Sequence, residues 1–318
     1  MHAGSEAALP RYVMLELTNA CDLRCRHCAF HGDGVEKRRP VGHMSEQVWR
    51  AAIEEVVAWD SAVVLQPWGM GEPLLAPQLW QVVAAAKHSP RIEVGFYTNG
   101  NQWQAADIDH ALASGLDWVT FSIDGLRRDV FSHYRVGADF DRVLGTLRTL
   151  ADARARAGLR RPELRVNMVQ YPELADHAEE FVAEMQGLAD SVMVSRFRRT
   201  GDRRFSPVVL PRVPCYQLDT MLAMAWDGRV VQCCEDPHGD VIVGWFPAQD
   251  LRAIWNCDAL VQLRAAHREG RYAASPLCAD CDGWTGIYGR EHVRNGVRVL
   301  ERTAATIYEF DAASGHQP

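Results

Sequence analysis

The sequence lacks an uninterrupted apolar run of about 18 residues, the length that a membrane-spanning helix requires. Its opening segment, MHAGSEAALP, also lacks the basic region and the apolar stretch of a secretory signal peptide. Positive charge is not in excess, because the formal net charge of the 318 residues is −7. These absences predict a cytoplasmic protein that binds neither a membrane nor nucleic acid, since nucleic-acid binders present a basic face.

Low-complexity tracts and repeats are absent too, and the 47% hydrophobic and 24% charged content is ordinary for a globular protein. The length suits one large domain and one small domain. Nine cysteines gather in clusters along the chain. Because cytosolic thiols stay reduced, we expect these clusters to bind metal rather than to form disulfides.

Short apolar runs alternate with helical periodicity up to about residue 197. This alternation indicates βα units and a parallel sheet. Six units predict an α/β fold, a partial (β/α)6 TIM-like barrel, whose reactive groups come from the loops after the strands. The expected strands are 12–18, 62–66, 92–97, 118–123, 164–169 and 191–197, and the expected helices are 44–59, 77–87, 103–114, 128–157 and 173–188.

The pattern changes near residue 200, where a basic stretch is followed by several prolines. We therefore predict a barrel domain over residues 1–204 and a small cysteine-containing domain over residues 205–318. Within the second domain, 221–232 is expected to form a hairpin that turns at Asp227-Gly228. A C-terminal helix and a frayed tail over 312–318 complete the prediction.

Three cysteines, Cys21, Cys25 and Cys28, follow the first expected strand directly. Thiolates suit iron–sulfur clusters and zinc. Three of them can hold a cubane and leave its fourth iron without a protein ligand, and such an iron can bind a substrate or a cofactor. A zinc site is the alternative, with His27 or His31 as a further ligand, although zinc sites usually show paired Cys-x-x-Cys units.

The spacing of this trio resembles the radical S-adenosylmethionine (SAM) superfamily, and three further motifs follow in that superfamily's order. They are Gly69-Met70-Gly71-Glu72-Pro73, Tyr97-Thr98-Asn99-Gly100 and Phe121-Ser122-Ile123-Asp124-Gly125. The resemblance implies that the trio holds a 4Fe–4S cluster that cleaves SAM and starts chemistry by hydrogen abstraction. The SAM-binding residues that it implies are Gly69, Gly71, Glu72, Asn99, Ser122 and Asp124. His27 departs from the aromatic residue that the superfamily often carries to position adenine.

The later cysteines are spaced in a way that resembles the twitch domain, the shortened SPASM domain behind some radical SAM barrels. The resemblance implies one auxiliary 4Fe–4S cluster, held by Cys215, Cys233, Cys278 and Cys281. A full SPASM domain has further cysteines after the last pair, and none follow Cys281. A structural zinc site with the same ligands is the alternative. Cys257 is left over, and we expect it to be structural.

A barrel and a twitch domain without further modules resemble the small enzymes that act on aminocyclitols and aminoglycoside sugars, the dehydrogenases and epimerases of antibiotic biosynthesis. We therefore expect hydrogen abstraction from a carbinol carbon of an amino sugar. About ten residues precede the first expected strand, too few for a leader-binding module, although peptide modification with leader binding in trans stays open. A metal protein without SAM chemistry is the other alternative. The resemblance also implies an external one-electron reductant such as flavodoxin or ferredoxin.

Cys234 lies beside a predicted cluster ligand and is the candidate hydrogen donor. A thiol there can return a hydrogen atom to the opposite face of the carbon radical, which inverts the centre. The aminocyclitol dehydrogenase carries a non-thiol residue at the equivalent position, so Cys234 favours epimerisation over oxidation to a ketone through the auxiliary cluster. Its other interpretation is a small buried hydrophobe.

Charged side chains near the expected site have two interpretations each. Arg196 and Arg198 follow the sixth expected strand, and arginine is a strong donor to an ionising oxygen. A solvated basic loop explains them equally well. Glu235, Asp236 and Asp282 flank predicted cluster ligands and are candidates to pair with ammonium groups of an amino sugar, or are solvated carboxylates.

Overall fold

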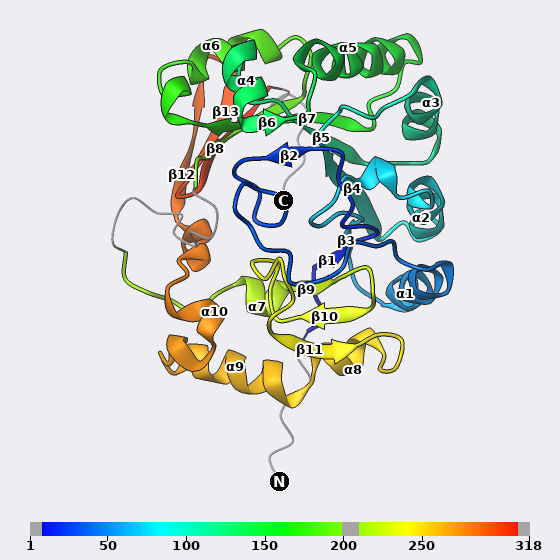
Figure 1. The fold of residues 1–318 in the computed structure, drawn as a ribbon, viewed down its shortest axis with the longest axis vertical. Helices are drawn as coiled ribbons and strands as arrows, with labels where there is room; N and C mark the ends of the chain where they lie inside the picture. Colours follow the sequence, from blue (N-terminus) through cyan, green and yellow to red (C-terminus); the bar gives the residue numbers. More distant parts are fainter. Residues whose placement is uncertain (1–7, 199–209, 311–318) are drawn as a thin grey trace.

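The computed structural model describes residues 8–198 and 210–310. All six expected barrel strands are present, and each pairs in parallel with the next. They are β1 (Tyr12–Leu15), β3 (Val63–Gln66), β4 (Ile92–Thr98), β5 (Trp118–Ser122), β7 (Glu163–Gln170) and β8 (Ser191–Arg196). Figure 1 shows the predicted α/β fold, a partial barrel with helices outside the sheet. The predicted domain boundary at 204 and the tail at 312–318 lie outside the described residues.

The helices pack their apolar faces on the outer side of the sheet. They are α1 (Glu46–Ala58), α2 (Leu79–Ala86), α3 (Ala105–Ala113), α5 (Phe140–Arg156) and α6 (Ala178–Met185), with short 3-10 turns η1 (Pro73–Leu75) and η2 (Pro172–Leu174). In α1 the Ser45 side chain accepts the Val48 N–H as an N-cap. The buried residues Trp49, Ile53 and Val56 follow helical spacing, so this face joins the core.

The single helix expected over 128–157 is wrong. The chain forms α4 (Arg128–Tyr134), then the short strand β6 (Arg135–Val136), and then α5. Gly137 has a φ of 100°, which a helix does not contain. β6 pairs antiparallel with β2 (Arg24–Cys25), so contact with the cysteine loop interrupts the helical pattern.

The second part of the chain first extends the sheet beside β1. β9 (Met221–Met224) pairs in parallel with β1, and β10 (Arg229–Val231) and β11 (Ile242–Trp245) continue outward in antiparallel pairing. The expected hairpin at Asp227-Gly228 is confirmed. The helical elements of this part are α7 (Gln217–Thr220), α8 (Leu251–Trp255), α9 (Asp258–Arg268), η3 (Tyr272–Ala274), α10 (Pro276–Ala279) and η4 (Gly283–Ile287).

The expected C-terminal helix is wrong over the residues that the structure describes. After η4 the chain forms β12 (Gly289–Arg294), β13 (Val297–Arg302) and β14 (Ala305–Glu309). Asn295 and Gly296, both with positive φ, make the turn between the first two strands. β14 pairs antiparallel with β8, so the described part of the sheet has twelve strands, with later chain on both sides of the barrel strands.

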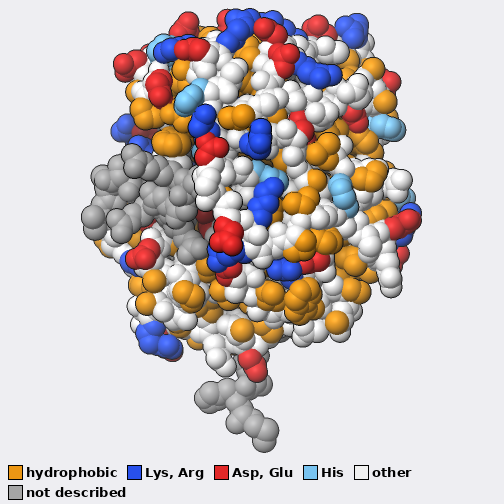
Figure 2. Space-filling view, viewed as in Figure 1, with side chains coloured by type: hydrophobic (Ala, Val, Ile, Leu, Met, Phe, Trp, Pro, Cys, Tyr) orange, Lys and Arg blue, Asp and Glu red, His pale blue; other side chains and the backbone are white. Residues whose placement is uncertain are grey.

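The surface is mixed in charge on the face that Figure 2 shows, where acidic and basic side chains are interspersed. Within the described ranges, no helix has the length and apolar character to cross a membrane.

Candidate functional site

The first cysteine trio lies on the loop after β1, and β6 holds the middle of that loop through β2. Backbone N–H groups point at the thiols: the Leu23 N–H lies 3.5 Å from Cys21 Sγ, and the His31 N–H lies 3.2 Å from Cys28 Sγ. Hydrogen bonds to sulfur are a feature by which proteins tune iron–sulfur clusters. The donor set and its surroundings therefore fit the predicted three-cysteine cluster.

Burial makes these thiols hard to ionise unless a cation is bound. Burial raises the pKa of Cys25 to about 11, against the opposing charge of Arg135, and raises the pKa of Cys21 well above its ordinary value. A coordinated thiol loses its proton to the metal. Metal binding and deprotonation are therefore linked at this loop.

Asp22 ties the cysteine loop to the loop after β4. Its carboxylate accepts hydrogen bonds from the side-chain amides of Asn99 at 2.7 Å, Asn101 at 2.8 Å and Gln102 at 2.8 Å. The same Asn99 amide lies 4.0 Å from Cys21 Sγ. Asn99 thus lies beside Cys21, and its role in SAM binding stays a prediction. Sequence reasoning missed Asp22, because nothing local in the sequence marks it.

The glycine loop after β3 packs directly on the chain that leads into the cysteines. A Cβ on Gly71 would lie 2.5 Å from the carbonyl oxygens of Thr18 and Ala20, closer than real Cβ atoms approach. A Cβ on Gly69 would meet side-chain atoms of Glu16 at 2.7 Å. Both glycines are therefore required by close approach, which gives a physical reason for this part of the motif.

Glu72 joins the glycine loop to the loop after β4. Its carboxylate accepts the Thr98 hydroxyl at 2.8 Å and the Asn99 N–H at 2.7 Å. Burial raises the pKa of Glu72 to about 7, against the effect of these hydrogen bonds. Two of the predicted SAM-binding loops are therefore held together by this one side chain.

Asp124 is fully buried in a network of polar side chains. It accepts from Arg135 Nε at 2.7 Å, the Tyr171 hydroxyl at 2.9 Å and the Val169 N–H at 2.9 Å. The Tyr171 oxygen lies 2.8 Å from His27 Nδ1. Since the Tyr171 hydroxyl donates to Asp124, its oxygen accepts the hydrogen bond from His27, and Nδ1 is the protonated nitrogen of that ring. Burial lowers the pKa of His27 to about 4, so the ring is neutral.

This network changes how Asp124 can act. Arg135 Nη2 also donates to its first oxygen, at 3.1 Å, so both carboxylate oxygens are occupied by protein donors. Asp124 therefore orients Arg135 and Tyr171 directly, and His27 through Tyr171, and its role in SAM binding stays a prediction. Sequence reasoning did not connect Arg135 or Tyr171 to the site, because both come from other segments of the chain.

Ser122 belongs to a row of polar side chains on the inner face of the sheet. It pairs in register with Asn167 of β7, and Ser195 Oγ of β8 donates to Asn167 Oδ1 at 2.6 Å. Their neighbours along the strands, Phe121, Val166 and Val194, are buried in the core under the helices. Alternation of side chains therefore directs this polar row into the barrel.

The structure brings together the four cysteines predicted for the auxiliary cluster. Burial raises the pKa of Cys215 to about 12 and of Cys281 to about 11, and nearby Cys233 adds to the rise at both and at Cys278. The Gly283 N–H lies 3.3 Å from Cys281 Sγ. These residues fit an iron–sulfur cluster by their donor chemistry and their N–H contacts.

Among the residues of 8–198 and 210–310, no group of three or more His, Cys, Asp or Glu side chains is arranged to hold one metal ion. A cubane is larger than a single ion, so the thiolates that hold it stand further apart than those of a zinc site. In a zinc site each sulfur lies about 2.3 Å from the one metal ion. Metal counting separates the two cases directly.

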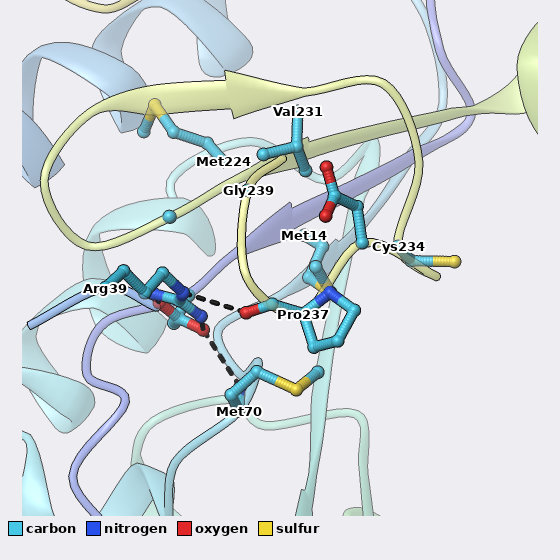
Figure 3. A pocket seen from close by; sticks show the side chains of 11 residues that line it. Met14, Arg39, Met70, Met224, Val231, Cys234, Pro237 and Gly239 are labelled. Atoms are coloured by element: carbon cyan, nitrogen blue, oxygen red, sulfur yellow. Dashed lines mark hydrogen bonds and ion pairs between the residues drawn. The ribbon is translucent and has the colours of Figure 1, made fainter. Parts of the chain in front are cut away.

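Cys234 lies beside Cys233. Both thiols donate toward the side-chain oxygen of Gln217, at 3.6 Å from Cys234 and 3.5 Å from Cys233. Cys234 packs against a small apolar cluster that includes Met14, and it lines a small pocket together with Met14 and Met70. Figure 3 shows its sulfur directed away from Met70. Cys234 is therefore between the barrel and the auxiliary cysteines.

The two candidate arginines differ in their surroundings. Arg196 is exposed at the end of β8, where its backbone N–H donates to Ala304. Arg198 Nη1 lies 3.4 Å from Glu235, which follows Cys234. This ion pair joins the end of the barrel to the auxiliary loop. Asp236 accepts two backbone N–H groups of its own loop, so it stabilises that loop.

Comparisons with known proteins agree with this geometry. A family profile described as the Radical SAM superfamily matches residues 15–184, and one described as an iron–sulfur cluster-binding domain, SPASM, matches residues 215–282. The S-adenosyl-L-methionine-dependent 2-deoxy-scyllo-inosamine dehydrogenase of Niallia circulans is 20% identical over 275 residues, which cover 85% of this chain and 92% of that protein. The GTP 3′,8-cyclase of Synechococcus elongatus is 31% identical over 176 residues, which cover 53% of this chain and 50% of that protein. The crystal structure of BtrN in complex with AdoMet and 2-DOIA has a TM-score of 0.61 and 19% identity, and covers 87% of this chain and 94% of that chain.

Proposed function

Because the chain belongs to the radical SAM superfamily and carries a SPASM-type domain, we propose that it abstracts a hydrogen atom from a carbinol carbon of an amino sugar or aminocyclitol. The observation that carries this proposal is the span of the resemblance to the inosamine dehydrogenase, which covers 85% of the chain and both matched domains. The match to the GTP 3′,8-cyclase, in contrast, covers only 53% of this chain. The bound cluster and SAM would supply the 5′-deoxyadenosyl radical.

The inner face of the barrel suits a polyol. Ser122, Asn167 and Ser195 present hydroxyl and amide groups on adjacent strands near their C-terminal ends. Such groups both donate and accept hydrogen bonds, as hydroxyl-rich ligands require. Arg198, which forms an ion pair with Glu235, lies just after the C-terminal end of β8.

We propose epimerisation as the fate of the carbon radical, with Cys234 as the hydrogen donor. Inversion needs a donor on the face opposite the abstracted hydrogen, and a thiol has a weak S–H bond. The transfer leaves a thiyl radical on Cys234, and one electron and one proton restore the thiol. The position of Cys234 beside Cys233, a proposed ligand of the auxiliary cluster, supports such a reduction.

Dehydrogenation is the second candidate, favoured by the activity in the name of the inosamine dehydrogenase. The carbinol radical would then lose one electron to the auxiliary cluster and one proton to a base, which gives a ketone. Arg198 is proposed to stabilise the ionising hydroxyl in this case. Cys234 would then only pack against Met14 and its neighbours.

An anaerobic reaction in heavy water with a panel of aminoglycoside intermediates separates these outcomes. Epimerisation places deuterium on an inverted carbon, whereas dehydrogenation gives a ketone. Cys234→Ala should abolish inversion and preserve 5′-deoxyadenosine formation, and Cys257→Ala, which packs against the main core, is the matched control. Unchanged inversion in Cys234→Ala refutes the donor role. Failure of every polyol to raise 5′-deoxyadenosine formation refutes the substrate class.

A further inference from the structure

A buried ion pair between Glu16 and Arg39 lies where three parts of the protein meet. Glu16 follows β1, and Arg39 lies on the loop after the first cysteine trio. Both side chains are only 3% exposed. The Arg39 guanidinium donates to the two oxygens of Glu16 in a bidentate arrangement, at 2.5 and 2.7 Å.

The pair connects the glycine loop to the auxiliary loop. Glu16 Oε2 also accepts the Met70 N–H at 2.9 Å, and Met70 is the central residue between Gly69 and Gly71. On the other side, Arg39 Nε donates to the Pro237 carbonyl at 2.8 Å, on the loop that begins at Cys233. Figure 3 marks the contact of Arg39 with the Pro237 carbonyl and the contact made at Met70, and all of these residues line the pocket.

A third contact reaches the first cysteine loop. The Arg39 guanidinium stacks over the Phe30 ring at 4.7 Å from its centroid. The Phe30 N–H in turn lies 3.4 Å from Cys28 Sγ. One side chain therefore contacts the segment beside the predicted SAM cluster, the carboxylate that holds the glycine loop, and the auxiliary loop.

Stability alone does not account for a charged pair at this position. Replacing a buried ion pair by well-packed apolar residues is often neutral or stabilising, because both charges are removed from water on folding. The pair fixes the relative orientation of the two side chains, because the bidentate contact allows only one geometry. The Gly69 contact with Glu16 shows that the glycine loop is fitted closely to this side chain.

We propose that Glu16 and Arg39 are positioning residues that set the glycine loop against both cysteine-bearing loops and so determine SAM affinity. They act through Met70 and Pro237 and do not contact the reacting atoms. The inference concerns SAM binding in the absence of substrate, so it stands or falls independently of the sugar chemistry proposed above.

The test is the double variant Glu16→Met/Arg39→Met, which removes both charges and keeps the volume. We expect folding and iron content to be retained and SAM affinity to fall about tenfold or more, as for lost outer-shell partners of metal sites. SAM affinity is measured anaerobically by titration, and the EPR spectrum of the reduced cluster should change less on SAM addition than in the native protein. A merely structural role would lower the melting temperature without moving either readout.

The matched control is Lys87→Met/Asp117→Asn, at an ion pair of 2.7 Å that lies before β5, at the opposite end of the strands. It should leave SAM affinity unchanged even where the melting temperature falls. A folded, iron-loaded Glu16→Met/Arg39→Met protein with native SAM affinity overturns the inference. If the double variant does not fold, Arg39→Lys decides the question, because it keeps the charge but loses the fork to Glu16 and Pro237. Native affinity in Arg39→Lys overturns the inference, and a several-fold loss supports it.

Discussion

Substituting Gly71 by alanine tests whether the glycine loop must lie directly on the chain before Cys21. The added Cβ would sit 2.5 Å from two carbonyl oxygens, those of Thr18 and Ala20, and real Cβ atoms do not come within 3.0 Å. The loop must therefore move by at least the difference, about 0.5 Å, and neither oxygen can rotate away because both belong to the backbone. Misplacement of about 1 Å in a reacting complex costs on the order of a hundredfold in rate. We expect a ten- to hundredfold loss of 5′-deoxyadenosine formation, with a loss of about 1–3 kcal/mol in stability from overpacking.

Gly145→Ala is the matched control for this variant. Gly145 lies inside α5, and a Cβ there meets nothing within 4 Å. Alanine should therefore stabilise the protein by about 0.5–1 kcal/mol through helix propensity and leave SAM cleavage unchanged. The assays are anaerobic product analysis, SAM titration and thermal unfolding. Native SAM affinity and cleavage rate in Gly71→Ala would refute the reasoning, because the loop would then tolerate the displacement.

Two further predictions concern the buried network and the auxiliary cysteines. Asp124→Asn leaves Arg135 as an uncompensated buried charge, so its free energy of unfolding in denaturant should fall by about 3–5 kcal/mol. Tyr171→Phe removes one hydrogen bond and should lower the free energy of unfolding by about 1 kcal/mol. Equal losses in the two variants would contradict the ion-pair account. Cys278→Ala should lower the iron content from about eight to about four per chain and preserve uncoupled SAM cleavage. Stoichiometric zinc in the anaerobically reconstituted native protein would contradict the auxiliary cluster.

The barrel was predictable because its signals are local. Each strand is a short apolar run, and each helix has its own periodicity and cap, as Ser45 shows at the start of α1. The errors arose where distant segments decide the conformation. The segment 128–157 is divided because Arg135 and Val136 pair with the cysteine loop, more than a hundred residues away. The Asn295-Gly296 dipeptide was a usable hairpin signal that sequence reasoning did not apply.

The candidate site divides in the same way. The cysteines and the glycine loop could be predicted because their spacing in the sequence is itself the signal. The ion pairs that orient them were not, since Glu16 meets Arg39 and Asp124 meets Arg135 only in the folded chain. Glu16 did carry a clue, because a carboxylate in an otherwise apolar run, next to Leu15 and Leu17, needs a buried partner.

The order of strands in the sheet has a consequence for folding during synthesis on the ribosome. β8 finds its outer neighbour in β14, which ends at Glu309, and β1 finds its outer neighbour in β9. During synthesis, β1 and β8 are therefore edge strands with unpaired backbone N–H and C=O groups until β9 and β14 have been made. Unpaired edge strands can pair with other chains and aggregate. The chain must be made as far as Glu309 before β14 can pair with β8, so a variant that lacks β14 would leave that edge of the barrel unpaired and prone to aggregation.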